Sequence, residues 1–278
     1  MQEHTSAVAA DAKGSAPALL LDRPQAGVAV VTLNQPETRN SLSLTMIDAL
    51  HTAVDDLAND RGVATVVLAA SSPVFCAGHD LKELTAHRAD SDRGTAFFKE
   101  TMTRCSALMQ AIVACPKPVI AAVQGTATAA GCQLVATCDL AVAARSAKFC
   151  TPGVNIGLFC STPMVALSRN VSRKRAMEML LLGETISADA AAEYGLVNRV
   201  VPDADVLKEA VALAAKIAAK SPLTVATGKV TFYAQAEMPL REAYDHASKV
   251  MAENMMARDA EEGISAFLEK RKPKWTGR

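Results

Sequence analysis

The sequence predicts an α/β protein whose strands pair in parallel. From about residue 19 to residue 201, short apolar runs alternate with stretches in which apolar residues recur at helical spacing. Two of the runs, VATVVLAA at 63–70 and PVIAAVQG at 118–125, are almost wholly apolar. Strands of a parallel sheet have this character because helices cover both of its faces. Alternation of strands and helices is typical of parallel α/β folds.

The individual elements follow in chain order. Ser43 is a good N-cap for a helix through residue 59, in which apolar residues recur at helical spacing. The stretch 34–40 predicts a turn, 71–80 a loop and 148–163 a further polar turn. The same signals predict further strands at 28–33, 139–144 and 195–202, and helices at 95–114, 130–137, 163–169, 172–182 and 187–194.

The character of the chain changes after Pro202. Residues 203–270 are rich in Ala and helical in pattern, and Pro222 and Pro239 mark helix starts. We therefore divide the chain into a flexible tail at 1–17, a core at 18–202 and a helical region at 203–278. The apolar residues that this region has to spare suggest burial against another subunit.

Composition excludes several classes of function. Lys and Arg together number 29, as do Asp and Glu, and this balance argues against nucleic-acid binding. No apolar run is long enough for a membrane span. The seven cysteines form no CxxC motif, so we expect reduced thiols and no metal site. Residues 1–17 resemble neither a secretory signal nor a presequence, which predicts a cytoplasmic protein.

Two stretches carry the functional signal: FCAGHDLKEL at 75–84 and VQGTATAAGCQLVATCDLAVA at 123–143. Each places Gly and small residues where a chain turns tightly and then begins a helix. Each can therefore direct a backbone N–H toward a ligand, and two such N–H groups converging on one point form an oxyanion hole.

Together with other segments, these stretches resemble the crotonase (enoyl-CoA hydratase/isomerase) superfamily over about residues 18–275. The segments that carry the resemblance are, in order, NQPETRNSLS, VVLAASSPVFCAGHDLKEL, KPVIAAVQGTATAAGCQLVATCDLAVAA, KFCTPGVNIGLF, ETISADAAAEYGLVNRVVP and FLEKRKPKW. The resemblance implies a spiral of ββα units and a C-terminal helical oligomerisation region. It also implies a homotrimer or hexamer that binds acyl-CoA thioesters, with coenzyme A as part of the substrate and no separate cofactor.

The resemblance also implies which residues form the site. The N–H groups of His79 and Ala130 would hold the thioester oxygen, and Ala130 lies where a helix begins, so the helix dipole favours negative charge there. The neighbours implied as substrate-binding residues are Ala77, Gly78, Asp80, Leu81 and Gly131.

The chain departs from the family at the proton-transfer positions. Hydratases of the family use two glutamates, and the matching positions here are Gln133 and Gly153. A glutamine side chain cannot exchange a proton near neutral pH, so we expect hydration to be weak or altered. Isomerases of the family also use an acid deeper in the third loop, and Ser161 occupies that position.

Several side chains near these loops leave two interpretations open. The His79 ring is either a substitute general base or a residue that tolerates an unusual turn conformation, and Asp80 is expected to cap or brace that turn. Asn155, Cys160, Ser161 and Thr162 either line the acyl pocket or bind an anion, although N-capping also explains Ser161 and Thr162. Cys132 and Cys160 are either nucleophiles or small buried thiols.

Cations that could bind the coenzyme A phosphates occur in three places. Arg39 lies in the early turn, Lys82 follows the first glycine-rich stretch, and Lys270 belongs to the basic tail EKRKPKW at 269–275. In the family such a tail can reach the nucleotide of a neighbouring subunit. A solvated helix face is the alternative for the tail.

Three functions stay open on these residues. The first is an enzyme of acyl-CoA or fatty-acid metabolism of the hydratase/isomerase type, with a mechanism that does not use glutamate. The second is a non-catalytic acyl-CoA-binding or regulatory protein. The third is a decarboxylase or thioesterase built on the same fold. A likeness of fold does not choose among them.

Overall fold

The computed structural model describes residues 6–8 and 16–278, and it confirms the α/β fold. Within these residues, seven strands form one sheet in the order β1-β2-β3-β4-β6-β8-β11. The pairings from β3 through β4, β6 and β8 to β11 are all parallel, as the apolar runs predict. The strands are β1 (Ser6–Val8), β2 (Leu19–Gln25), β3 (Gly27–Leu33), β4 (Val63–Ala70), β6 (Val119–Val123), β8 (Leu140–Ala144) and β11 (Arg199–Val201).

A second, smaller sheet explains the spiral of ββα units. In the described part of the chain it has four short strands in the order β10-β9-β7-β5. Each strand from β4 to β8 of the large sheet is followed by one strand of the small sheet and then by a helix. The small strands are β5 (Val74–Cys76), β7 (Thr126–Thr128), β9 (Lys148–Cys150) and β10 (Ile186–Ser187).

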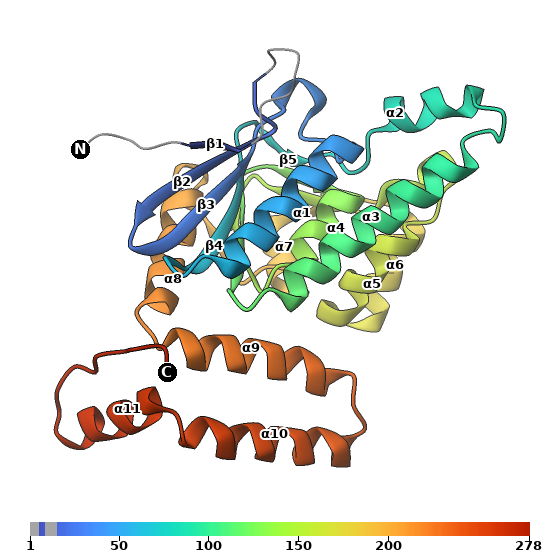
Figure 1. Cartoon of the computed structure of the whole chain (residues 1–278). Helices are drawn as coiled ribbons and strands as arrows, with labels where there is room; N and C mark the ends of the chain where they lie inside the picture. Colours follow the sequence, from blue (N-terminus) through green and yellow to red (C-terminus); the bar gives the residue numbers. More distant parts are fainter. Residues whose placement is uncertain (1–5, 9–15) are drawn as a thin grey trace.

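Helices cover both faces of the large sheet (Figure 1). On one side α8 (Val206–Ala218) packs against β3, β4, β6 and β8, where Ala210 and Ala214 are fully buried. On the other side α1 and α3 pack against each other. The helices of the core are α1 (Leu44–Asn59), α2 (Leu81–Ala86), α3 (Thr95–Ala114), α4 (Ala130–Thr137), α5 (Ser161–Asn170), α6 (Arg173–Leu182) and α7 (Ala188–Glu193).

The last three helices, α9 (Pro222–Ala236), α10 (Leu240–Met255) and α11 (Arg258–Leu268), form a separate layer below the α/β body in Figure 1. The chain end returns to the start of α9. There the buried carboxylate of Asp259 accepts hydrogen bonds from Ser221 and from the N–H groups of Thr276 and Gly277. The terminal segment is thereby tied to the junction of α9 and α11.

Short elements are where the sequence prediction falls short. Alternation over two or three residues cannot be recognised, so β5, β7, β9 and β10 are absent from the prediction. The six-residue helix α2 and the seven-residue strand β2 are also absent, while the other long elements agree within a few residues. Most of the predicted tail at 1–17 lies outside the described residues, while Ser6–Val8 form β1 and pair with β2. The division at residue 202 stays a prediction.

Gly125 shows how closely the small sheet is packed. A Cβ atom at this position would lie 1.7 Å from the carbonyl oxygen of Pro73, far inside van der Waals contact. Gly228 in α9 is the opposite case, because a Cβ atom there would meet nothing within 4 Å. Alanine at these two positions therefore compares a crowded site with an open one.

We predict opposite effects for alanine at these two positions. Gly125→Ala should lower the free energy of unfolding by about 1–3 kcal/mol, the usual cost of overpacking. Gly228→Ala should raise it by about 0.5–1 kcal/mol, because alanine is favoured over glycine within a helix. Urea denaturation of both variants measures the difference. Equal effects would contradict the close approach at Gly125.

Candidate functional site

The first glycine-rich loop is held by backbone hydrogen bonds to the segment that precedes α1. Ala77 N donates to Arg39 O at 3.1 Å, Leu42 N to Gly78 O at 2.8 Å, and Asp80 N to Leu42 O at 3.4 Å. This is a parallel bridge between Leu42 and His79. In such a bridge one residue, here Leu42, makes both hydrogen bonds through its own N–H and C=O, while the N–H of the other residue points away. The His79 N–H is therefore directed to the side opposite Leu42.

The second loop ends where α4 begins. Ala129 has a left-handed φ of 51°, and its N–H donates to Cys150 O at 2.9 Å. Ala130 is then the first helical residue, as the sequence predicts. Its N–H is one of the first groups of a helix, which have no acceptor in the preceding turn. A Cβ atom at Gly131 would lie 2.2 Å from Cys76 O, so only glycine lets α4 approach β5 this closely.

The two loops converge. Gly78 has a φ of 84°, and a Cβ atom there would lie 3.2 Å from the nitrogen of Ala130 and 3.0 Å from Thr128 O. Among the described residues, neither the His79 N–H nor the Ala130 N–H has a hydrogen-bond acceptor. Two N–H groups without partners, on adjoining loops and at a helix N-terminus, suit a ligand oxygen that carries negative charge.

The His79 ring is uncharged at neutral pH. Burial lowers its pKa to about 4, because desolvation disfavours the imidazolium form. Its Nε2 atom is buried and has no hydrogen-bond partner among the described residues. The alternative that His79 occupies an unusual turn conformation is wrong, since the positive φ angles belong to Gly78 and Ala129.

Gln133 lies one turn after Ala130 in α4, whose residues are all buried. Its side chain is only 4% exposed, and Oε1 has no hydrogen-bond partner in the described part of the chain. Side chains in a helix lean toward its N-terminus, so that of Gln133 lies over the turn that begins with Ala130. Buried polar atoms without partners are rare, and a ligand or water that donates a hydrogen bond would satisfy this one.

Gly153 has no room for a side chain. It lies in a short 3-10 helix, Pro152–Ile156. A Cβ atom there would meet Leu158 O at 2.8 Å and the Cys160 sulfur at 3.0 Å. Position 153, which the resemblance predicted to match a glutamate of the hydratases, is therefore closed in this backbone, and a substitution there would have to move the chain.

Helix α5 does not begin where N-capping by Ser161 or Thr162 would require. The N-cap of α5 is Cys160 and makes no side-chain cap, and Ser161 Oγ donates weakly to Phe159 O at 3.4 Å. Capping by Ser161 or Thr162 is therefore wrong, because the helix begins one residue earlier than that interpretation requires. Burial raises the pKa of both the Cys132 and the Cys160 thiols, which opposes a nucleophilic role.

Of the remaining candidate residues, some lie beside the first loop and others lie elsewhere. Arg39 is exposed, and its carbonyl bond to Ala77 places it beside the first loop. Lys82 and Leu81 are exposed in the first turn of α2. Asn155 is instead tied by its amide to Gly183 O at 3.4 Å. Lys270 follows α11 in the separate helical layer, which lies apart from α2 and α4, the helices that follow the two loops (Figure 1).

Two carboxylates brace the first loop. Asp80 caps α2 by accepting from Lys82 N and Glu83 N, and it also accepts from Ser41 Oγ. Glu83 in turn accepts from Leu44 N at 3.1 Å and so caps α1. The role of Glu83 was not predicted, because nothing in the sequence indicates contact between residues 39 positions apart.

Comparison with known proteins identifies the family of the chain. The sequence model of the family described as "Enoyl-CoA hydratase/isomerase" matches residues 23–278. The chain belongs to the enoyl-CoA hydratase/isomerase family. It is 53% identical to an enoyl-CoA hydratase from Mycobacterium smegmatis whose crystal structure superposes with a TM-score of 0.88, covering 93% of this chain and 99% of that one. The crotonase resemblance is thus confirmed.

Two further relatives carry the same printed name, enoyl-CoA hydratase domain-containing protein 3, mitochondrial. The rat protein is 46% identical over 262 residues, or 94% of this chain and 86% of its own length. The human protein is 47% identical over 250 residues, or 90% of this chain and 81% of its own length. These names contradict the predicted cytoplasmic location, which rested only on the composition of residues 1–17.

Metal-binding clusters and membrane-spanning helices are both missing from the described part of this family member. Within residues 6–8 and 16–278, no group of three or more His, Cys, Asp or Glu side chains is arranged to hold a metal ion. In the same part of the chain, none of the helices has the length and apolar character needed to cross a bilayer.

The lowered pKa of His79 predicts a pH dependence of stability. Between about pH 6.5, the ordinary value, and about pH 4, the unfolded state binds more protons than the folded state, so the free energy of unfolding rises with pH. The contribution is present above pH 6.5 and is lost as the pH falls toward 4. His79→Gln should reduce the loss of stability measured by urea denaturation between these two pH values.

A histidine that lies on α1 provides the control. The side chain of His51 is 36% exposed, so His51→Gln should leave the difference in unfolding free energy between pH 6.5 and pH 4 close to that of the wild type. An unchanged pH dependence in His79→Gln would show that the ring is solvated and not buried.

Proposed function

We propose that this protein binds an acyl-CoA thioester, with the thioester oxygen between the N–H groups of His79 and Ala130. The observation that carries the proposal is the pair of N–H groups without acceptors on converging loops, one of them at the start of α4. Membership of the enoyl-CoA hydratase/isomerase family supports it. A thioester oxygen gains negative charge when an enolate forms, and N–H groups held in place favour that charge.

The exposed Arg39 supports the same ligand. Its backbone is fixed beside the first loop by the bond to Ala77, while its guanidinium is free to meet solvent or a phosphate. Lys82 follows the same loop, in the first turn of α2. We propose these two cations as partners of the coenzyme A phosphates, which matches the charge of the ligand.

We further propose that hydration of an enoyl thioester is slow in this protein. Hydration needs one group that takes a proton from water and a proton delivered to the α-carbon. Gln133 cannot exchange a proton near neutral pH, and Gly153 has neither a side chain nor space for one. Groups of this kind contribute about 10²–10⁴ each to the rate.

A non-catalytic acyl-CoA-binding protein is the second candidate. The observation in its favour is that the two buried side chains with unpartnered polar atoms beside these N–H groups are uncharged at neutral pH: His79 through its lowered pKa, and Gln133 by its chemistry. The site can therefore bind a polar acyl chain without providing an acid or a base. Decarboxylation and thioester hydrolysis stay predictions.

Assembly into a homotrimer or hexamer is also proposed. Large apolar side chains are exposed on the C-terminal helical layer, and none of the residues of α10 is buried. Soluble monomers rarely expose so much contiguous apolar surface. The side chains concerned include Phe232, Leu240, Tyr244, Met251, Met256 and Phe267.

Removal of one N–H group tests the binding proposal. Replacement of the amide between Ala129 and Ala130 by an ester deletes the N–H and keeps the side chain. The affinity for butyryl-CoA, measured by calorimetry, should fall about threefold to tenfold, the value of one neutral hydrogen bond. The thioether S-butyl-CoA has no carbonyl oxygen, so its affinity should not change. Failure of the unmodified protein to bind any CoA ester would refute the proposal.

Restoration of one carboxylate tests the chemical proposal. Gln133→Glu should raise the rate of crotonyl-CoA hydration at least about tenfold, because it provides a general base or acid. Gln110→Glu, at an exposed position of α3, makes the same change in charge and should have no effect. Ultraviolet absorbance of the conjugated thioester follows the reaction. Rapid hydration by the wild type would show that the missing glutamates are not needed.

A further inference from the structure

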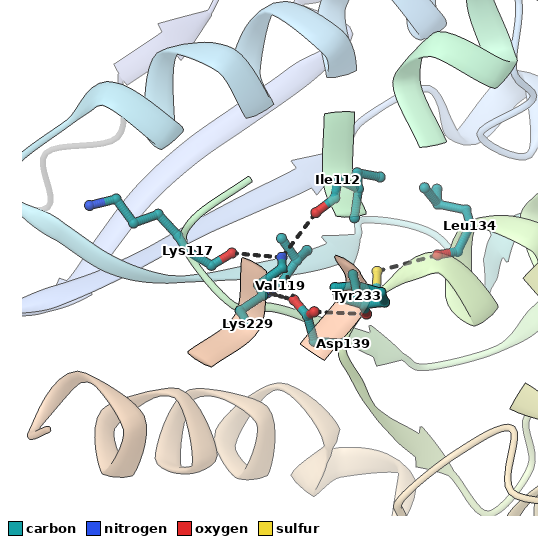
Figure 2. Close-up of polar contacts among 8 residues, drawn as sticks. Ile112, Lys117, Val119, Leu134, Asp139, Lys229 and Tyr233 are labelled. Atoms are coloured by element: carbon teal, nitrogen blue, oxygen red, sulfur yellow. Dashed lines mark hydrogen bonds and ion pairs between the residues drawn. The ribbon is translucent and has the colours of Figure 1, made fainter. Parts of the chain in front are cut away.

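A largely buried ion pair between Lys229 and Asp139 lies at the C-terminal end of α4. Asp139 follows the last turn of α4, and its carboxylate accepts hydrogen bonds from Lys229 Nζ at 2.7 Å, Tyr233 Oη at 2.9 Å and Val119 N at 2.7 Å. Figure 2 shows Lys229 and Tyr233 converging on Asp139. Both side chains come from α9, some 90 residues later in the chain. The cluster therefore ties the C-terminal layer to the core.

The ammonium group of Lys229 donates three hydrogen bonds, one for each of its protons. Besides Asp139 it donates to Ile112 O at 2.9 Å, in the last turn of α3, and to Lys117 O at 3.1 Å. The Lys229 side chain is 5% exposed. A buried ion pair is stable only when such further hydrogen bonds satisfy both charges. Removal of Lys229 would leave a buried carboxylate and two carbonyl groups without this donor.

The cluster and the proposed oxyanion site lie at opposite ends of one short helix. α4 has eight residues and rises about 1.5 Å per residue, so its ends are about 12 Å apart. At its C-terminal end, Cys138 N donates to Leu134 O, and the backbone of Asp139 donates to Val119 O at 2.9 Å. α4 is wholly buried, and close-packed interiors transmit strain. The packed residues of α4 thus connect Asp139 with Ala130.

We propose that Lys229 and Tyr233 are positioning residues, which act through Asp139 and α4 to direct the Ala130 N–H at the thioester oxygen. The proposal rests on the proposed function, because it assigns α9 a role in that same site. The C-terminal layer thus does more than supply surface for assembly. It holds the rear of the helix whose front end binds the ligand.

The experiment compares two ligands that differ only at the carbonyl group. Affinities for butyryl-CoA and S-butyl-CoA are measured by calorimetry for the wild type, Lys229→Met, Tyr233→Phe and Lys229→Arg. The carbonyl stretching frequency of ¹³C-labelled butyryl-CoA is recorded for each by infrared spectroscopy. Lys249→Met, on the exposed face of α10 with its side chain 75% exposed, is the matched control for the loss of a lysine.

We expect Lys229→Met to weaken butyryl-CoA about threefold to tenfold relative to S-butyl-CoA, and to return the carbonyl frequency toward its value in water. Tyr233→Phe removes one hydroxyl and should have a smaller effect of the same kind. Lys229→Arg should restore part of the affinity ratio. Lys249→Met should match the wild type in both measurements.

Other results would overturn the proposal. If Lys229→Met weakens both ligands equally and leaves the carbonyl frequency unchanged, the ion pair contributes only to folding. If Lys229→Met does not fold, an unchanged ligand ratio and frequency in Tyr233→Phe would overturn the positioning role in the same way. Failure of the proposed function is distinct, because the wild type itself would then show no preference for the thioester and no shift in frequency.

Discussion

The close contact between the first turn of α4 and strand β5 is the constraint on which the site depends. A Cβ atom at Gly131 would overlap the carbonyl group of Cys76, so the backbones touch with no side chain between them. This contact brings the Ala130 N–H beside the loop that carries His79. The backbone hydrogen bonds between the same loop and the segment of Arg39 and Leu42 then determine which way the His79 N–H points. The site is thus built mainly from backbone, and its side chains modify it.

Those side chains make the site neutral. Burial keeps the His79 ring uncharged, and a glutamine stands one turn into α4 where a carboxylate would carry charge. Both leave a buried polar atom without a partner in the described chain, at a cost in folding free energy that a bound ligand or water would offset. Such buried polar atoms without partners are rare in folded proteins. The charged groups near α4 lie instead at its far end, where Asp139 and Lys229 satisfy each other.

Most long elements and local signals were predictable from the sequence, and strand β2 is the exception. The apolar runs of β4 and β6, the Ser43 cap of α1 and the helix start at Ala130 each depend on residues close together in the chain. The three-residue strands of the small sheet were not, because they gain their stability from neighbouring strands and carry no pattern of their own. The capping alternative for Ser161 failed because α5 begins at Ser161 itself, one residue earlier than a cap there requires.

The sequence by itself determined which chemical groups are available: two glycine-rich loops that can direct backbone N–H groups, and the uncharged Gln133 and Gly153 at the positions where the resemblance predicts carboxylates. Only the tertiary structure decided how they act. It showed that position 153 is closed by the carbonyl of Leu158, that the His79 ring is neutral, and that Lys229 reaches Asp139. Each of these depends on groups far apart in the chain, whose distances and solvation arise only when the elements pack.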